Sequence, residues 1–385
     1  MELNGTYSNL TCHPAVIEYR YFGALLGILV TAVGTVGNIM TLLAFATDKK
    51  IRTRFNLLIL NLTLADLCYC TFLQPVTVDT FIHFTWRQGD LMCRVFGLFL
   101  FVANSVSIFN LVLIAMSRYI LISDPKRFDR VYSRYTMPLF MLGPWALGFS
   151  LFGPLWNIYV FLPPVCTCSF HRSRGRPYTS ILMFLMFGLG LSSIGIFYFL
   201  INRKVKAASK ALEEYRIKSQ TQPNKNKRRK SQIVTVMAEL SQTDSGVDSA
   251  VSQSASESQN TQEFNTDDET GYGPQAPESK GSDKVNAYQS RKNHNNEFKR
   301  VTRMCFAMFV VYVTCYLPFC LMHIADRRER APILAHMIAG NFTWLNSCIN
   351  PILYVVMNRQ FREAYKGVLT KAANGFRRLL GLRRD

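Results

Sequence analysis

Long apolar runs constrain this chain more than any other feature of its sequence. Seven stretches are long enough to cross a membrane as helices, because a helix rises about 1.5 Å per residue and the hydrocarbon core is about 30 Å thick. We therefore predict an all-α membrane protein folded as a seven-helix bundle. The runs extend approximately over Arg20–Thr47, Asn56–His83, Met92–Tyr119, Tyr135–Val160, Tyr178–Ile201, Val301–Ile324 and Pro332–Met357.

The basic residues predict how this bundle is oriented. Every lysine lies before the second run, between the third and fourth, between the fifth and sixth, or after the seventh. These segments share one side, which the positive-inside rule identifies as the cytoplasm. Arginine is less regular, since residues 172–176 and 327–330 carry arginines on the other side. The net charge of +19 then lies mainly beside anionic membrane lipids and requires no nucleic-acid partner.

An outside N-terminus follows from this orientation, and the odd number of crossings places the C-terminus inside. The first residues are polar and lack the apolar core of a cleavable signal peptide, so the first run is expected to act as the insertion signal. Sequons at Asn4 and Asn9 fit glycosylation of an extracellular tail. Those at Asn61 and Asn341 lie within apolar runs and are interpreted as chance matches.

Composition divides the chain further. Residues 241–283 are rich in Ser, Gln, Asp, Glu and Gly and cannot bury enough apolar surface to offset the entropy of ordering, so disorder is predicted there. The predicted segments are an extracellular tail (1–19), helices one to five (20–206), a largely disordered third cytoplasmic loop (207–297), helices six and seven (298–357), and an amphipathic helix with the cytoplasmic tail (358–385).

The cysteines fall into two groups. Those inside the apolar runs are interpreted as small apolar fillers, whereas Cys12, Cys93, Cys166 and Cys168 lie outside, where disulfides persist. Two disulfides are therefore expected. A zinc site is the competing interpretation, but a Cys-x-Cys motif alone is weak evidence and the chain has no cluster of histidines to complete such a site.

Polar residues inside the runs indicate a functional interior, because ionisable groups in a membrane are costly. Asp66 is the deepest of them. On the third run, Asn104, Ser107, Leu111 and Arg118 share one helical face. Polar groups that only hold helices together are the alternative. No nucleophile elbow, phosphate-binding loop or His-Glu-x-x-His motif is present, so an enzyme is not expected.

Together these residues resemble the rhodopsin-like G-protein-coupled receptors across all seven runs. The similarity is carried by Gly37-Asn38, Leu62-x-x-x-Asp66, Cys93, Arg118-Tyr119, Trp145, Tyr198, Cys315-Tyr-Leu-Pro318, Asn350-Pro351-Ile-Leu-Tyr354 and a short amphipathic helix at Arg359–Lys366. More narrowly, segments such as "CRVFGLFLFVANSVSI" and "PVCTCSFHRSRGRPYT" are similar to receptors for medium-chain and hydroxylated fatty acids. A receptor for another lipid or a peptide, or a transporter or channel, is the alternative.

The resemblance implies a plasma-membrane receptor that signals through a heterotrimeric G protein of the inhibitory class. Arrestin and receptor kinases would act on the third loop and tail, and membrane lipids would surround the bundle. The residues implied in G-protein coupling and activation are Arg118, Tyr119, Tyr198, Pro318, Asn350, Pro351 and Tyr354.

Several positions depart from the family pattern. Ser117 replaces the acid that usually pairs with the arginine at Arg118, so that restraint must be weaker or replaced by other contacts. The usual proline of the fifth run is replaced near Gly190. Tyr316 and Tyr312 take the places of a tryptophan and a phenylalanine on the sixth run, where Pro318 still provides a kink.

The resemblance also implies specific sites. The disulfides would be Cys93–Cys168 and Cys12–Cys166. No cofactor is implied beyond an allosteric sodium ion, for which oxygen ligands are suitable; its residues would be Asp66, Ser107, Asn346, Ser347 and Asn350. Arg172 would bind the carboxylate of the ligand through two parallel hydrogen bonds. The other residues predicted to line the cavity are Tyr69, Phe101, Asn104, Tyr316, Phe319, Asn341 and Trp344.

Overall fold

The computed structural model describes residues 10–171, 174–221, 280–326 and 331–379. The chain divides into two compact units. The first comprises residues 1–223 and 300–385, and the second comprises residues 224–299, of which only the helical residues 280–299 are described. Residues 280–299 begin the helix Lys280–Ala325, and apart from them everything below concerns the first unit.

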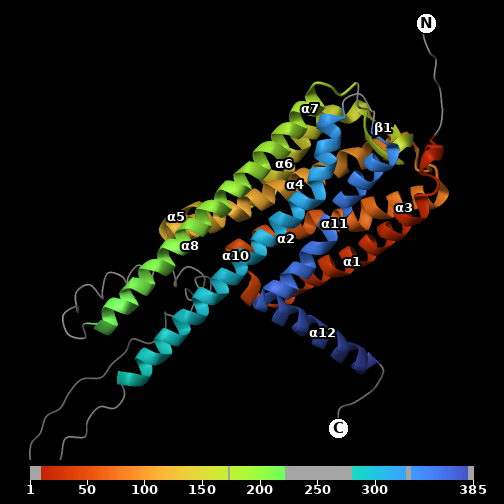
Figure 1. Cartoon of the computed structure of the whole chain (residues 1–385). Coiled ribbons are helices and arrows are strands. Elements are labelled where there is room, and N and C mark those ends of the chain that lie inside the picture. Colours follow the sequence, from red (N-terminus) through yellow and green to blue (C-terminus); the bar gives the residue numbers. More distant parts are fainter. Residues whose placement is uncertain (1–9, 172–173, 222–279, 327–330, 380–385) are drawn as a thin grey trace, which may run out of the picture. The chain divides into compact units, whose positions relative to one another are not determined.

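Long helices that lie side by side dominate this unit (Figure 1). Two predicted spans are composite, since each contains a π-helical segment, η3 in the second span and η6 in the fifth. The helices of the bundle are α1 (Arg20–Thr47), α2–η3–α3 (Arg54–Cys68, Tyr69–Leu73, Gln74–His83), α4 (Gly89–Ser123), α6 (Met137–Phe152), α7–η6–α8 (Tyr178–Met183, Phe184–Leu189, Gly190–Thr221), α10 (Lys280–Ala325) and α11 (Ile333–Met357).

Shorter elements precede or connect these helices. The 3-10 turns are η1 (Pro14–Val16), η2 (Lys49–Ile51), η4 (Gly153–Ile158) and η5 (Pro163–Val165), and the short helix α5 covers Pro125–Val131. α12 (Arg359–Leu379) follows α11 and lies at the end of the bundle opposite β1 (Figure 1).

Hydropathy alone recovers six of the seven predicted spans among the described residues. The exception is α11, which is 25 residues long but carries the buried amides Asn341, Asn346 and Asn350. These side chains lower the hydropathy of the helix, yet they are buried inside the bundle and not exposed on its outer surface. α11 is thus a helix of the bundle whose polar face turns inward, as expected for a functional interior.

The structure corrects three predicted boundaries. The fourth span was predicted to reach Val160, but α6 ends at Phe152 because Pro154 has no backbone N–H with which to continue the helix. The predicted disordered loop 207–297 is helical at both ends, through Thr221 in α8 and from Lys280 in α10; residues 222–279 lie outside the described residues. The last helix extends beyond Lys366 to Leu379.

A two-stranded hairpin at one end of the bundle was not predicted (Figure 1). β1 (Tyr159–Leu162) pairs antiparallel with β2 (Thr167–Phe170), with Tyr159 opposite Phe170 and Phe161 opposite Cys168. The alternating burial of β2 places Cys168 and Phe170 inward. The hairpin therefore lies over the outer end of the bundle interior.

Gly190 allows α8 to approach α4 closely. A Cβ atom at this position would lie 2.3 Å from Cδ1 of Ile108, closer than any real contact. The glycine that stands near the usual proline position thus provides space for Ile108.

Gly190→Ala should therefore lower the thermal midpoint of the purified receptor, because overpacking typically costs about 1–3 kcal/mol. Gly195→Ala on the same helix is the control, since a Cβ there meets no atom within 4 Å. Thermal unfolding would measure both, and the double variant Gly190→Ala/Ile108→Ala should recover part of the loss. Equal midpoints for the two single variants would contradict this packing.

Candidate functional site: a covered cavity and a buried arginine

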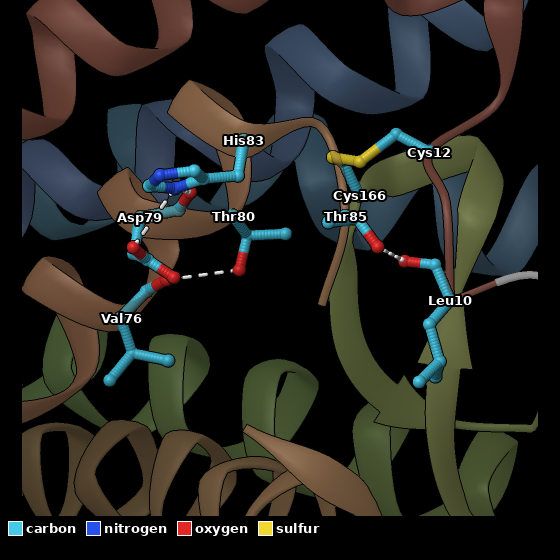
Figure 2. Close-up of a disulfide and its surroundings, with 8 residues drawn as sticks. All are labelled: Leu10, Cys12, Val76, Asp79, Thr80, His83, Thr85 and Cys166. Carbon is cyan, nitrogen blue, oxygen red and sulfur yellow. Dashed lines mark hydrogen bonds and ion pairs between the residues drawn. A yellow bond between two sulfur atoms is a disulfide. The ribbon is translucent and has the colours of Figure 1, made fainter. Parts of the chain in front are cut away.

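Two disulfides hold the outer cover in place. Cys93 at the start of α4 is bonded to Cys168 in β2, and Cys12 in the N-terminal segment is bonded to Cys166 (Figure 2). These are the two predicted pairs. All four residues are buried, so the bridges form part of the packed cover.

The N-terminal segment is also tied down by its backbone. The amide of Trp86 donates to the carbonyl of Leu10 at 2.7 Å, and the amide of Cys12 donates to the carbonyl of Phe84 at 3.0 Å. The hydroxyl of Thr85 donates to the same Leu10 carbonyl at 2.9 Å (Figure 2). The described part of the tail therefore lies on the loop between α3 and α4 as an ordered strap. The predicted glycosylation sites Asn4 and Asn9 lie outside the described residues.

Beneath this cover lies a cavity of about 120 Å³. Its wall comes from η3, α3, α4, α6, α7, η6, α10, α11 and the hairpin with its connecting turn η5. Every predicted cavity residue that the structure describes lines it: Tyr69, Phe101, Asn104, Tyr316, Phe319, Asn341 and Trp344. Arg172 lies outside the described residues.

The inner part of the cavity is built from stacked rings and one amide. The Tyr316 hydroxyl donates to Oδ1 of Asn104 at 2.5 Å, which joins α10 to α4. The rings of Tyr312 and Tyr316 stack with centroids 4.4 Å apart, and Phe187 lies 5.6 Å from Tyr316. This arrangement closes the floor with aromatic surface and leaves the Asn104 amide nitrogen as a donor.

Asn341 offers a hydrogen-bond acceptor to the cavity, whereas Asn104 offers a donor. The amide nitrogen of Asn341 donates to the hydroxyl of Tyr19 at 2.9 Å, so its carbonyl oxygen remains as an acceptor. Burial raises the pKa of Tyr19, although the bond from Asn341 acts in the other direction, so the phenol stays protonated at neutral pH. The cavity wall therefore carries one amide donor and one amide acceptor, the pair that a hydroxyl group can satisfy.

Two histidines of the wall were not predicted. His336 lies on α11 with Nε2 2.7 Å from Oδ2 of Asp326, and the ring of His323 on α10 meets Phe170 at 5.4 Å. Both line the cavity. Helical spacing contained a signal for His323, because it follows Phe319 by four residues and so shares its face. His336 precedes Asn341 by five residues, which turns it away from that face, so spacing gave no signal for it.

Deeper in the bundle, Asp66 is the centre of a polar cluster. It is fully buried, and its Oδ2 accepts from the Asn350 amide at 2.8 Å. Within the described part of the chain, Asp66 Oδ1 and Asn38 Oδ1 have no hydrogen-bond partner. The other predicted members, Ser107, Asn346 and Ser347, are buried as well. Asp66 thus lies with the Asn350 amide in a buried polar region, and it is the single carboxylate among these residues.

At the inner end, Arg118 is covered. Arg118 is only 4% exposed. Its side chain lies beside Cys305 of α10 and Tyr198 of α8. Ser117, in place of the usual acid, donates its hydroxyl to the Ile114 carbonyl at 2.8 Å. The serine is therefore engaged with its own helix.

The remaining predicted coupling residues lie at the same end or are prolines within helices. The Tyr198 ring meets Phe306 at 5.5 Å, Tyr119 meets Phe197 at 5.9 Å, and Tyr354 meets Phe361 of α12 at 5.3 Å. Pro318 and Pro351 lie inside α10 and α11.

A covered outer cavity, a buried acid and a covered inner arginine in one seven-helix bundle define a transmembrane receptor. The chain belongs to the 7 transmembrane receptor (rhodopsin family), whose sequence model matches residues 37–354. It is 46% identical to the G-protein coupled receptor 84 of Mus musculus, over 97% of this chain and 99% of that protein. For the protein of the same name from Homo sapiens the identity is 44%, over 98% of this chain and 99% of that one.

More distant relatives include the melatonin receptor type 1B of Rattus norvegicus, 22% identical over 89% of this chain and 76% of that receptor. The family membership establishes a multi-pass plasma-membrane receptor that acts through a ligand and a G protein and is not an enzyme. The transporter alternative is thereby set aside.

Proposed function

We propose that this receptor is activated by medium-chain free fatty acids, including hydroxylated ones, and signals through inhibitory-class heterotrimeric G proteins. The observation that carries the proposal is the cavity wall. It is formed largely by aromatic and aliphatic side chains and is closed at its floor by Tyr316. A single apolar tail of limited length suits such a site better than a polar ligand does.

The two amides support hydroxylated ligands in particular. The Asn104 nitrogen can donate to a hydroxyl, and the Asn341 oxygen can accept from one, because their other atoms are engaged by Tyr316 and Tyr19. Arg172 would bind the carboxylate, as the similarity to fatty-acid receptors implies. A peptide ligand is the second candidate, but the hairpin and its disulfides cover the cavity.

The proposal is tested by a chain-length series of saturated and 3-hydroxylated fatty acids in a nucleotide-exchange assay with inhibitory-class G protein. Each added methylene should make the free energy of binding more favourable by about 0.8 kcal/mol. Potency should therefore rise with chain length and then fall once the tail reaches the floor. An optimum at intermediate length supports the proposal. Absence of any response across the series, in a receptor that responds to a peptide, would overturn it.

A sodium ion is a further component of the proposal. The Asp66 cluster fits it, because the buried carboxylate has an oxygen without a hydrogen-bond partner among the described residues and its neighbours supply more oxygens. Asp66, Ser107, Asn346, Ser347 and Asn350 would hold the ion, which would supply the positive charge that a carboxylate in a membrane requires. Arrestin and receptor kinases are proposed partners of the third loop and tail.

Asp66→Asn should remove the effect of sodium on agonist binding. In the unmodified receptor we expect sodium to lower agonist affinity about fivefold or more, the usual range of allosteric coupling. Competition binding in sodium chloride and in N-methylglucamine chloride would measure it, since the second salt keeps the ionic strength constant. Sodium dependence that survives in Asp66→Asn would place the ion elsewhere or leave the cluster as a hydrogen-bonded hub.

A further inference from the structure

The guanidinium of Arg118 lies over an aromatic ring of another helix. Its guanidinium carbon is 3.3 Å from the ring centroid of Phe55, the second residue of α2. Both residues are only 4% exposed. A guanidinium at this distance over a ring face is attracted by the negative face of the π system, and the attraction is strongest where water is excluded.

The start of α2 holds this ring in a defined place. Thr53 caps the helix, accepting from the Asn56 amide at 3.2 Å, and the Asn56 side chain donates to the Ile51 carbonyl at 2.8 Å. Arg54 forms an ion pair with Asp129 of α5 at 3.0 Å. These contacts anchor the start of α2, and with it the position from which the Phe55 ring projects.

We propose that Phe55 is a positioning residue of this receptor, whose ring face restrains Arg118 in the covered state where relatives use a carboxylate. Position 117 cannot supply the restraint, since it is a serine whose hydroxyl is bonded to Ile114. A G protein must reach Arg118, so release of the guanidinium from the ring precedes coupling. The restraint therefore lowers the basal activity of the receptor.

The proposal rests on the family membership and on this contact, and it is independent of the ligand. Nucleotide exchange by the full-length receptor in membranes, without ligand and at matched surface expression, tests it. Phe55→Leu keeps an apolar side chain but removes the ring face, and basal exchange should rise roughly three- to tenfold. Phe55→Tyr keeps the face and should leave basal exchange near the level of the unmodified receptor.

A second pair of variants separates restraint from packing. Ser117→Asp places a carboxylate beside Arg118, so the double variant Ser117→Asp/Phe55→Leu should return basal exchange toward the unmodified level. Where Phe55→Leu does not reach the surface, phenylalanines with one, two or three ring fluorines at position 55 serve instead. They keep the shape of the ring while weakening its negative face, and basal exchange should rise with each fluorine.

The outcomes decide between two roles. A rise confined to variants that weaken the ring face, reversed by Ser117→Asp, supports the restraint. Equal effects of Phe55→Leu and Phe55→Tyr, or a flat fluorine series, would overturn it and show that Phe55 only fills space.

Discussion

Receptors that carry Arg118→Ala should bind ligand with unchanged affinity and reach the cell surface, yet catalyse no agonist-dependent nucleotide exchange. The arginine does not line the cavity, so ligand contacts stay intact. It lies among α2, α8 and α10, where only an opening of the inner end would present it to a G protein. In the proposed role of Arg118, losing its charge-assisted contacts with that partner should abolish exchange.

Radioligand binding, surface labelling and nucleotide exchange would be compared in the same membranes. Arg377→Ala is a suitable control, because it removes the same charge from an exposed position on α12. Near-normal exchange in Arg118→Ala would contradict the role assigned to this arginine.

The second large effect concerns the carboxylate of the proposed ligand. Arg172→Ala should reduce potency of the free acid by at least about 100-fold, because hydrogen bonds to a charged group contribute about 1.5–3 kcal/mol each and a carboxylate would be left without its partner. Arg172→Lys should recover only part of it, since the bidentate geometry is lost. Although Arg172 lies outside the described residues, the preceding His171 is anchored by its amide to the Ile158 carbonyl at 2.9 Å.

A methyl ester separates ligand binding from loop structure in this test. The ester cannot accept the paired bonds, so it should be weak on the unmodified receptor and lose little more on Arg172→Ala. Potency in nucleotide exchange would be measured for both compounds on both receptors. If acid and ester lose the same factor, Arg172 supports the hairpin and does not bind the ligand.

Much of the candidate site could be predicted, because its residues recur at helical spacing along single helices. Tyr316 and Phe319 are three residues apart, as are Asn341 and Trp344, so each pair had to share a face. The motif resemblance then indicated which faces turn inward, and the cavity contains all four. The disulfide pairs followed from the same resemblance.

Contacts between helices were not predictable in this way. Periodicity assigns Arg118 and Phe55 to faces of their helices, but it does not say that the two faces meet. The bond from Asn341 to Tyr19 likewise joins residues 322 positions apart. The hairpin was missed because its strands are only four residues each and follow an apolar run directly, where length and hydropathy favour continued helix.

The length of the apolar runs, the placement of lysines and the order of motifs were enough to establish the seven-helix bundle, its orientation and its family from the chain alone, because each depends on local composition or on short segments. The polarity of the cavity amides, the cover tied by Leu10 and Cys12, and the ring on which Arg118 rests were decided by the tertiary structure. They depend on which side chains from separate helices and loops come within hydrogen-bonding or van der Waals distance, and only the packed bundle sets those distances.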